Sequence, residues 1–403
     1  MRFSSFSRNN GDIITMKTLG STVSLALLSV SLASGCGSST HNSSVDVVNL
    51  PHTQVKWQSI GNCWAYAFAG WAESVVLGAT NGQKVINISE SYITYRHYEN
   101  QLNGGGDIRE VQTGGNFESA KSTAIRKGII LEGDFIPSEN SATYSAIQKS
   151  ATNYLNESLK TGALSKSKDA NTVRAELNRA FGVDLASLQS KIISASSLPG
   201  GLDVNGKVVN LEEKMRAMPS IYWPGSASSG RTENETIFYS KTRTAEEQAV
   251  LKRVKRALND GHPVVMDWFV DFNALSQGGI FSQAQLLKRG NGKQGYHSTV
   301  LEDYVVKVKN DDGTERIIGE GEASPEDKKL ALDKGEILYF VLKNSWGGSE
   351  RLDRSSYTRD GEKGYHRLEA DYIFSAVKVI DEDNGSYKYH DNVLQSFHLP
   401  SGY

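Results

Sequence analysis

Cysteine is almost absent from this sequence, since a chain of 403 residues has only two, Cys36 and Cys63. An excess of one charge is also lacking, because 44 basic and 46 acidic side chains leave a net charge of -2. This balance offers no basic field to nucleic acid, so we expect no nucleic-acid partner. The sequence has neither an internal repeat nor a glycine-rich nucleotide-binding loop. The length suits one large domain with insertions, or two domains sharing a cleft.

Long hydrophobic runs are missing too, and the apolar run near the N-terminus is too short to span a bilayer. Residues 16–36, MKTLGSTVSLALLSVSLASGC, have a basic residue, an uncharged apolar segment and then small residues, as in an export signal. The ending LASGC resembles a bacterial lipobox, whose cysteine is acylated after cleavage. We therefore expect a signal peptide over 1–36 with translation starting at Met16, a lipid on Cys36, and a flexible tether over 37–50. The alternatives are plain secretion and a buried apolar helix.

Lipidation of Cys36 would anchor the exported chain to a membrane of the bacterial cell envelope. The exported part would then keep one thiol, that of Cys63, in an oxidising compartment. An internal disulfide would be impossible. A lone thiol of this kind is either buried and inert or retained for its reactivity.

The residues around Cys63 predict a buried helix that begins at the cysteine. The segment NCWAYAFAGWA is apolar all round a helix, with Asn62 as a possible N-cap and Gly78 or Asn81-Gly82 at the end. The first turn of a helix favours an anion, so this placement predicts a lowered thiol pKa. The alternative is an inert cysteine on the buried face.

A nucleophilic thiolate needs a base, and the base needs an orienting group. Among the eight histidines, His297 is the best candidate, because it opens HSTVLEDYVVKV, a segment rich in β-branched residues that predicts a strand. A second apolar strand, ILYFVLK, ends just before Asn344. We expect Asn344 to accept the ring N–H of His297 and Trp346 to shield this hydrogen bond from water.

Four segments in order resemble papain-like cysteine peptidases. These are QSIGNCWAYAF, GGNFESAKSTAIRKGIILEGDFIP, GYHSTVLEDY, and VLKNSWGGS with the later GEKGYHRLE; HPVVMDWFVDFNALSQGGIFS between them is similar to a further strand and loop of the family.

This resemblance implies an α+β fold of two lobes, one helical and one resembling a β-barrel, with a catalytic cleft between them. It implies Cys63 as nucleophile, His297 as base, Asn344 as orienting residue, and an oxyanion hole made by Gln58 and the Cys63 N–H. Gly114 and Gly115 would pair with an extended substrate backbone, beside the cover formed by Trp346. Strands are expected near 263–269, 297–308, 337–346 and 364–369. No metal or other cofactor is expected.

The sequence departs from the family in the distance between cysteine and histidine, which is roughly 130 to 150 residues in relatives and much longer here. The surplus falls at about 138–246, where the composition predicts a helical insertion, either a roof over the cleft or a surface subdomain. We place the peptidase domain at 51–380 and a C-terminal tail at 381–403. The family's first cysteine is replaced by Ile60, and Gln58 stands five residues before Cys63 instead of six.

The resulting hypothesis is a lipid-anchored cysteine peptidase acting on peptides or proteins through an acyl-enzyme. Two alternatives remain open: a papain-fold protein that binds peptides without cleaving them, and an acyl transferase such as a transpeptidase or transglutaminase. Neither endo- nor exopeptidase action, nor the oligomeric state, follows from the sequence.

Overall fold

The computed structural model describes residues 50, 52–140, 142–226, 228–319, 323–347, 357–359, 362–381 and 383–403. The predicted signal peptide, Cys36 and all of the tether except Leu50 lie outside these residues. In the part of the chain that is described, no helix has the length and apolar character needed to cross a membrane.

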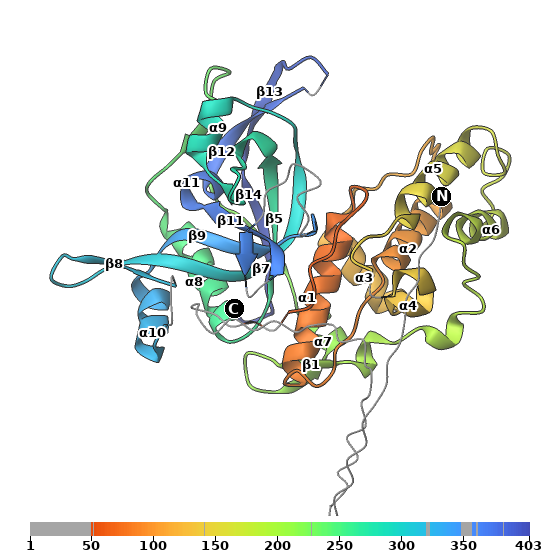
Figure 1. Cartoon of the computed structure of the whole chain (residues 1–403), viewed down its shortest axis with the longest axis horizontal. Helices are drawn as coiled ribbons and strands as arrows, with labels where there is room; N and C mark the ends of the chain where they lie inside the picture. Colours follow the sequence, from red (N-terminus) through yellow and green to blue (C-terminus); the bar gives the residue numbers. More distant parts are fainter. Residues whose placement is uncertain are drawn as a thin grey trace, which may run out of the picture. The chain divides into compact units, whose positions relative to one another are not determined.

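Helices α2 to α6 lie on one side of the described chain, and most of the strands lie on the other together with α8 to α11, while α1 runs between them (Figure 1). The helices are α1 (Cys63–Ala79), α2 (Glu90–Asn103), α3 (Phe117–Lys127), α4 (Glu132–Phe135), α5 (Ile147–Lys160), α6 (Ala170–Phe181), α7 (Leu211–Arg216), α8 (Ala245–Asn259), α9 (Gln283–Arg289), α10 (Pro325–Lys334) and α11 (Ala370–Ile373), with short 3-10 turns at Pro137–Glu139, Gln189–Lys191, Ala195–Ser197 and Phe272–Ala274. We call α1 to α6 the helical lobe.

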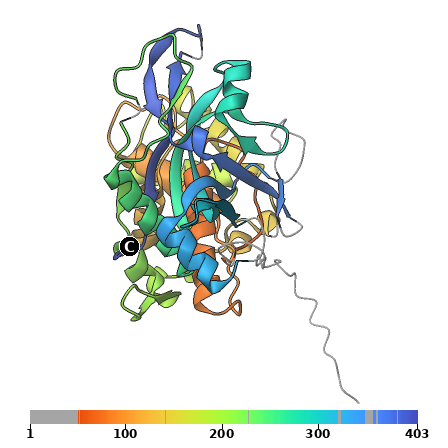
Figure 2. The same ribbon diagram turned by 90° about the vertical axis from the view of Figure 1, so that its left-hand side faces the viewer.

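The strands are β1 (Pro199–Leu202), β2 (Val208–Asn210), β3 (Ser220–Tyr222), β4 (Ile237–Tyr239), β5 (Val264–Asp271), β6 (Ile280–Phe281), β7 (Gln294–Lys309), β8 (Glu315–Ile318), β9 (Glu336–Lys343), β10 (Tyr357–Arg359), β11 (Glu362–Glu369), β12 (Ser375–Ile380), β13 (Tyr387–Asn392) and β14 (Leu394–His398). The largest sheet has the order β10-β11-β9-β7-β5-β14-β3, with β6 beside β11 and β8 beside β7. This sheet curls into a half-barrel (Figure 2). We call the half-barrel and the helices packed on it the sheet lobe. Smaller sheets have the orders β1-β2 and β13-β12-β4.

Helix α1 is buried on nearly all sides because its sequence is apolar all round. Its Trp71 packs with Phe117 of α3 and with Val265 and Val300 of the sheet in one hydrophobic cluster. The helix therefore joins the two lobes, and its first residue, Cys63, lies where β7 passes.

The predicted fold class is confirmed, and so are the four predicted strands. They correspond to β5, β7, β9 and β11, with boundaries that differ by up to three residues. Alternating apolar residues predict a strand with one buried face, and short continuous apolar runs predict a strand buried on both faces.

The helical character predicted for 138–246 is correct for only part of that segment. Helices α5 and α6 pack on α2 around a core of their own that includes Leu155 and Leu177. From Pro199 onward the same segment contains strands β1 to β4, of which β3 pairs with β14 and β4 with β12. Its three-residue strands carry too little pattern to be distinguished from loops in the sequence.

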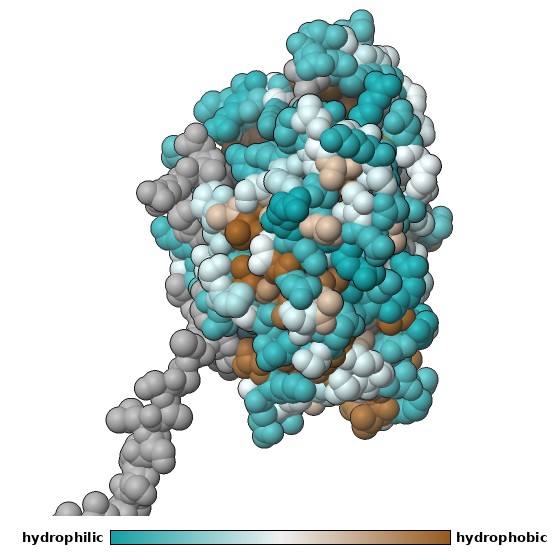
Figure 3. All heavy atoms as spheres, turned by 90° about the vertical axis from the view of Figure 1, so that its right-hand side faces the viewer, coloured by the Kyte–Doolittle hydropathy of each residue, from teal (hydrophilic) through white to brown (hydrophobic). Residues whose placement is uncertain are grey.

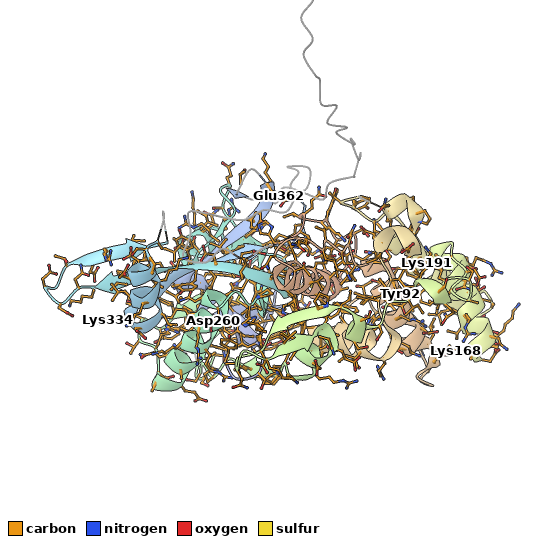
Figure 4. The ribbon with its side chains drawn as sticks, turned by 90° about the horizontal axis from the view of Figure 1, so that it is seen from below. Tyr92, Lys168, Lys191, Asp260, Lys334 and Glu362 are labelled. Carbon is orange, nitrogen blue, oxygen red and sulfur yellow. The ribbon has the colours of Figure 1, made fainter. Side chains whose placement is uncertain are left out.

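The helices of the insertion extend the helical lobe. Figure 4 labels Lys168, before α6, and Lys191, after it, on the same side of the molecule as Tyr92 of α2. The surface on this side is mainly hydrophilic, with small hydrophobic patches between polar residues (Figure 3).

Most of the segment 381–403, described from the sequence as a C-terminal tail, folds into the sheets. Residues 387–398 form β13 and β14, and β14 lies inside the largest sheet between β5 and β3. Phe397 and Leu399 are fully buried in the core of the sheet lobe. The end of the chain is therefore part of the fold.

Candidate active site

Cys63 is the first residue of α1 and is buried against the sheet lobe. The predicted Asn62 cap is wrong, because this side chain makes no capping hydrogen bond. Instead, Asn62 Nδ2 donates to Thr94 Oγ1 and to Gln148 Oε1, each at 3.0 Å. Asn62 therefore ties the start of α1 to α2 and α5.

His297 and Asn344 are brought together by the pairing of β7 with β9. His297 Nε2 lies 2.7 Å from Asn344 Oδ1, which also accepts the backbone N–H of Ser345 at 2.7 Å. Because this oxygen can only accept, Nε2 carries the proton and Nδ1 is the basic nitrogen of the neutral ring. The indole of Trp346 stacks on the imidazole with ring centroids 4.7 Å apart. The ring is thus fixed in both tautomer and orientation.

The sulfur of Cys63 lies against the segment of β7 that carries His297. The backbone N–H of Ser298, the next residue, supports the ionised thiol, as do the N–H groups of Trp64 and Cys63. Both His297 and Ser298 are buried. Cys63, His297 and Asn344 therefore come from three elements and meet where α1 faces β7 and the end of β9.

Gln58 is held by two hydrogen bonds beside these residues. Its Oε1 accepts from Ser345 Oγ at 2.6 Å, and its Nε2 donates to the carbonyl of Ile60 at 2.8 Å. Its backbone N–H also donates to the Ser345 carbonyl at 2.8 Å. A primary amide has two N–H groups, so Nε2 keeps a second donor besides the one given to Ile60.

Gly114 and Gly115 lie at the edge of the site, before α3. A Cβ at Gly115 would come within 2.6 Å of the Trp64 ring, whereas a Cβ at Gly114 would have no other atom within 4 Å. Trp64 Nε1 donates to the Thr113 carbonyl at 3.0 Å, and His97 Nε2 contacts the Gly114 carbonyl at 2.9 Å. The glycine segment is thereby held beside the residue that follows Cys63.

The thiol pKa differs from the expectation based on the helix start. Burial raises the pKa of Cys63 to about 11, and the charge of Asp267 adds to the rise, against the opposing effect of the three N–H groups. The free energy needed to remove a thiolate from water exceeds the stabilisation that the helix N-terminus gives to it. A thiolate at this position therefore requires a cation close by.

Buried charges fasten α1 to the end of β9 behind the site. Glu73 of α1 accepts from Thr53 Oγ1 at 2.5 Å and from the Ile88 N–H at 2.7 Å. Lys343, the residue before Asn344, donates to the Thr53 carbonyl. Nearby, Lys56 pairs with Glu90 at 2.8 Å. These contacts fix the two elements that carry Cys63 and Asn344.

Three residues at the site had no signal in the sequence that set them apart. Ser345 positions Gln58, the backbone N–H of Ser298 lowers the thiol pKa, and Asp267 accepts the hydroxyl of Ser298 while its charge raises the thiol pKa. Ser345 and Ser298 each directly follow a predicted catalytic residue, Asn344 and His297, and this position in the sequence is the one hint that could have pointed to them.

Comparison with known proteins gives structural similarity only. No protein-family model matches the chain, and no curated protein matches it either. Solved structures similar to this chain include PepW from Lactobacillus rhamnosis, with 12% identity and a TM-score of 0.40 over 91% of this chain and 82% of that one. Xylellain, a cysteine protease from Xylella fastidiosa, has 14% identity and a TM-score of 0.37 over 90% of this chain and 88% of its own.

The bromelain protease from Ananas comosus, solved in complex with the inhibitor E64, has 14% identity and a TM-score of 0.34 over 87% of this chain and 94% of its own. The chain thus resembles papain-like cysteine proteases. At these scores the similarity carries no argument about activity, which has to rest on the geometry of the site.

Proposed function

We propose that this protein is a thiol-dependent peptidase that hydrolyses peptide bonds through an acyl-enzyme on Cys63. The observation that carries the proposal is the 2.7 Å contact between His297 Nε2 and Asn344 Oδ1. It fixes Nδ1 as the proton acceptor on a strand whose next residue, Ser298, has a backbone N–H that lowers the pKa of the Cys63 thiol. A nucleophile, a base and an orienting residue are the three parts that this chemistry needs.

In the first half of the reaction, the Cys63 proton passes to His297 Nδ1, and the resulting imidazolium supplies the cation that the buried thiolate requires. The sulfur attacks the substrate carbonyl carbon, and the carbonyl oxygen becomes an oxyanion. Donors for it are the Cys63 N–H and the second N–H of Gln58 Nε2. When the C–N bond breaks, His297 gives its proton to the leaving amine.

In the second half, water attacks the thioester while His297 accepts a proton from it. The C–S bond then breaks, the acid product leaves, and the thiol is restored. Gly115 supports this reading on the substrate side, since neither its N–H nor its carbonyl has a hydrogen-bond partner among the described residues. An extended peptide can pair with a backbone of this kind.

We also propose that the chain is exported and held at a bacterial envelope membrane through a lipid on Cys36. The support is the lipobox-like LASGC and the apolar segment before it. Labelling of cells with a radioactive or clickable fatty acid tests this part. Incorporation that disappears in Cys36→Ala supports it, and incorporation that persists in that variant contradicts it.

The peptidase is tested by mass spectrometry of an unbiased peptide library incubated with the full chain and with Cys63→Ala. We expect cleavage that is lost in Cys63→Ala, while the thermal unfolding midpoint of the variant stays near that of the parent. Labelling of Cys63 by E64, the inhibitor bound in the bromelain structure, provides a second readout. Equal cleavage by both proteins would overturn the assignment.

The same library separates the two alternatives. A library that binds but is never cut favours a peptide-binding protein. For an acyl transferase, an added amine such as hydroxylamine or glycine amide would appear in conjugates in place of hydrolysis products. No feature of the site favours either of these over hydrolysis.

A further inference from the structure

A charge chain of four side chains connects α3 with the sheet beside Cys63. It consists of Asp267 of β5, His398 of β14, and Glu118 and Lys121 of α3. His398 Nε2 lies 2.7 Å from Asp267 Oδ2, and its Nδ1 lies 3.7 Å from Glu118 Oε1. Glu118 pairs in turn with Lys121 at 2.7 Å. With His398 protonated, two positive charges balance two negative ones.

The surroundings of His398 favour its protonated form. Only 3% of its side chain is exposed, and burial alone would disfavour a charge, but the hydrogen bond to Asp267 and the nearby carboxylate of Glu118 prevail and raise the pKa. The other groups that face it are the hydroxyl of Ser220, 3.0 Å from Nδ1, and the ring of Phe117. No other charged group contacts the imidazole within the described chain.

Asp267 connects this charge chain to the thiol. One carboxylate oxygen accepts from Ser298 Oγ, and the other accepts from Ser396 Oγ at 2.8 Å as well as from His398. The backbone N–H of Ser298 supports the Cys63 sulfur. A carboxylate so placed repels a thiolate, because like charges raise each other's free energy, and it raises the pKa of the Cys63 thiol. Its charge therefore has to be offset if the thiolate is to form.

Glu118 connects the charge chain to the glycine segment. It lies in the first turn of α3, which begins two residues after Gly115. Ser220 of β3 donates to Glu118 Oε1 at 3.1 Å, and Lys121 Nζ donates to the Met218 carbonyl at 2.8 Å. The start of α3 is thus fastened to the sheet lobe by polar contacts that centre on His398.

We propose that His398 is a positioning residue for the reaction at Cys63. Its positive charge offsets that of Asp267 beside the thiolate, and its contact with Glu118 holds the Gly114–Gly115 segment against the sheet. The second part rests on the proposed function, because it concerns peptide binding. The first part concerns the thiol alone and can be measured on a protein without any peptidase activity.

The electrostatic part is tested by the rate at which iodoacetamide alkylates Cys63 in the full chain between pH 5 and 11, followed at the Cys63 peptide by mass spectrometry. His398→Gln keeps a donor for Asp267 but removes the charge. We expect the alkylation rate at pH 7 to fall about tenfold, which corresponds to a rise of about one unit in the apparent thiol pKa. His262→Gln, which removes an imidazole outside the charge chain, is the matched control and should leave it unchanged.

A second substitution distinguishes charge from general damage. In Asp267→Asn/His398→Gln the repelling charge is gone, so the apparent thiol pKa should return to the parent value or below. If the rise persists in this double variant, or if His398→Gln causes none, the proposal is overturned. If His398→Gln does not fold, Asp267→Asn tests the proposal by itself. The proposal then requires that the pKa of the Cys63 thiol falls in Asp267→Asn.

The positioning part is tested with Glu118→Gln, which weakens the contact to α3 but leaves Asp267 paired with His398. With a peptide substrate we expect KM to rise severalfold with kcat little changed, and the thiol pKa to stay at the parent value. An unchanged KM would overturn this part. If no peptide is cleaved by the parent chain, the proposed function fails, while the alkylation experiment still decides the electrostatic part.

Discussion

His297 donates its Nε2–H to Asn344 Oδ1 at 2.7 Å, although the two residues come from different strands, β7 and β9. The backbone N–H of Ser345 binds the same oxygen and prevents the amide from turning. The imidazole therefore has one tautomer in its neutral form, with Nδ1 as the basic nitrogen. Peptidase activity through Cys63 requires this tautomer.

Asn344→Ala should leave the imidazole without its orienting partner. We expect kcat to fall by about a hundredfold, the cost of a misplaced catalytic group, with KM changing less. Steady-state kinetics on a peptide cut by the parent chain measure this. Asn310→Ala, in the turn after β7, is the control and should not change kcat; a parent-like kcat for Asn344→Ala would remove Asn344 from the mechanism.

Ser345→Ala should release Gln58, because Ser345 Oγ is the donor to its Oε1 at 2.6 Å. Loss of one oxyanion donor costs about 10²–10³ in kcat. We expect Gln58→Ala to show this loss and Ser345→Ala a smaller loss in the same direction. Ser165→Ala, an exposed serine in the insertion, is the control. If Gln58→Ala retains full kcat, the oxyanion is held by other donors.

Gly115→Ala should destabilise the protein, since the added methyl would lie within 2.9 Å of three atoms of the Trp64 ring. An overpacked site of this kind costs about 1–3 kcal/mol. Urea denaturation measures the free energy of unfolding. Gly114→Ala meets open space and serves as the stability control. Equal stability of the two variants would show that the Trp64 ring can move aside.

Glu118 should contribute stability that depends on pH. The nearby imidazole of His398 lowers its pKa from 4.5 to about 2, against the effect of partial burial. A lowered pKa in the folded state stabilises the protein above about pH 4.5, and this contribution is lost as the pH falls toward 2. We expect Glu118→Gln to lower the unfolding midpoint at pH 7 and to differ less from the parent near pH 2.5.

Thermal unfolding followed by circular dichroism at several pH values checks this trend. Glu233→Gln removes an exposed carboxylate away from the charge chain and should show no such convergence. A difference between Glu118→Gln and its parent that stays constant down to pH 2 would place the effect in packing and not in charge.

The sequence predicted the elements with strong patterns and missed those without. The continuous apolar runs of β5 and β9 and the all-round apolar α1 were recognised because burial of one or both faces demands such residues. The strands β1 to β4 and the C-terminal β13 and β14 were not recognised. With three to six residues each, they form only where the edge of a neighbouring strand is free to pair with them. That edge is a property of the tertiary fold.

The sequence by itself determined which side chains can carry the chemistry: a lone thiol at a helix start, a histidine opening one strand and an asparagine ending another. Only the tertiary structure decided what surrounds them. It put Ser345 on Gln58, Asp267 beside the thiol and His398 between Asp267 and Glu118. It also reversed the expected shift of the thiol pKa. The physical reason is that desolvation and charge depend on groups distant in the chain, which a local pattern does not record.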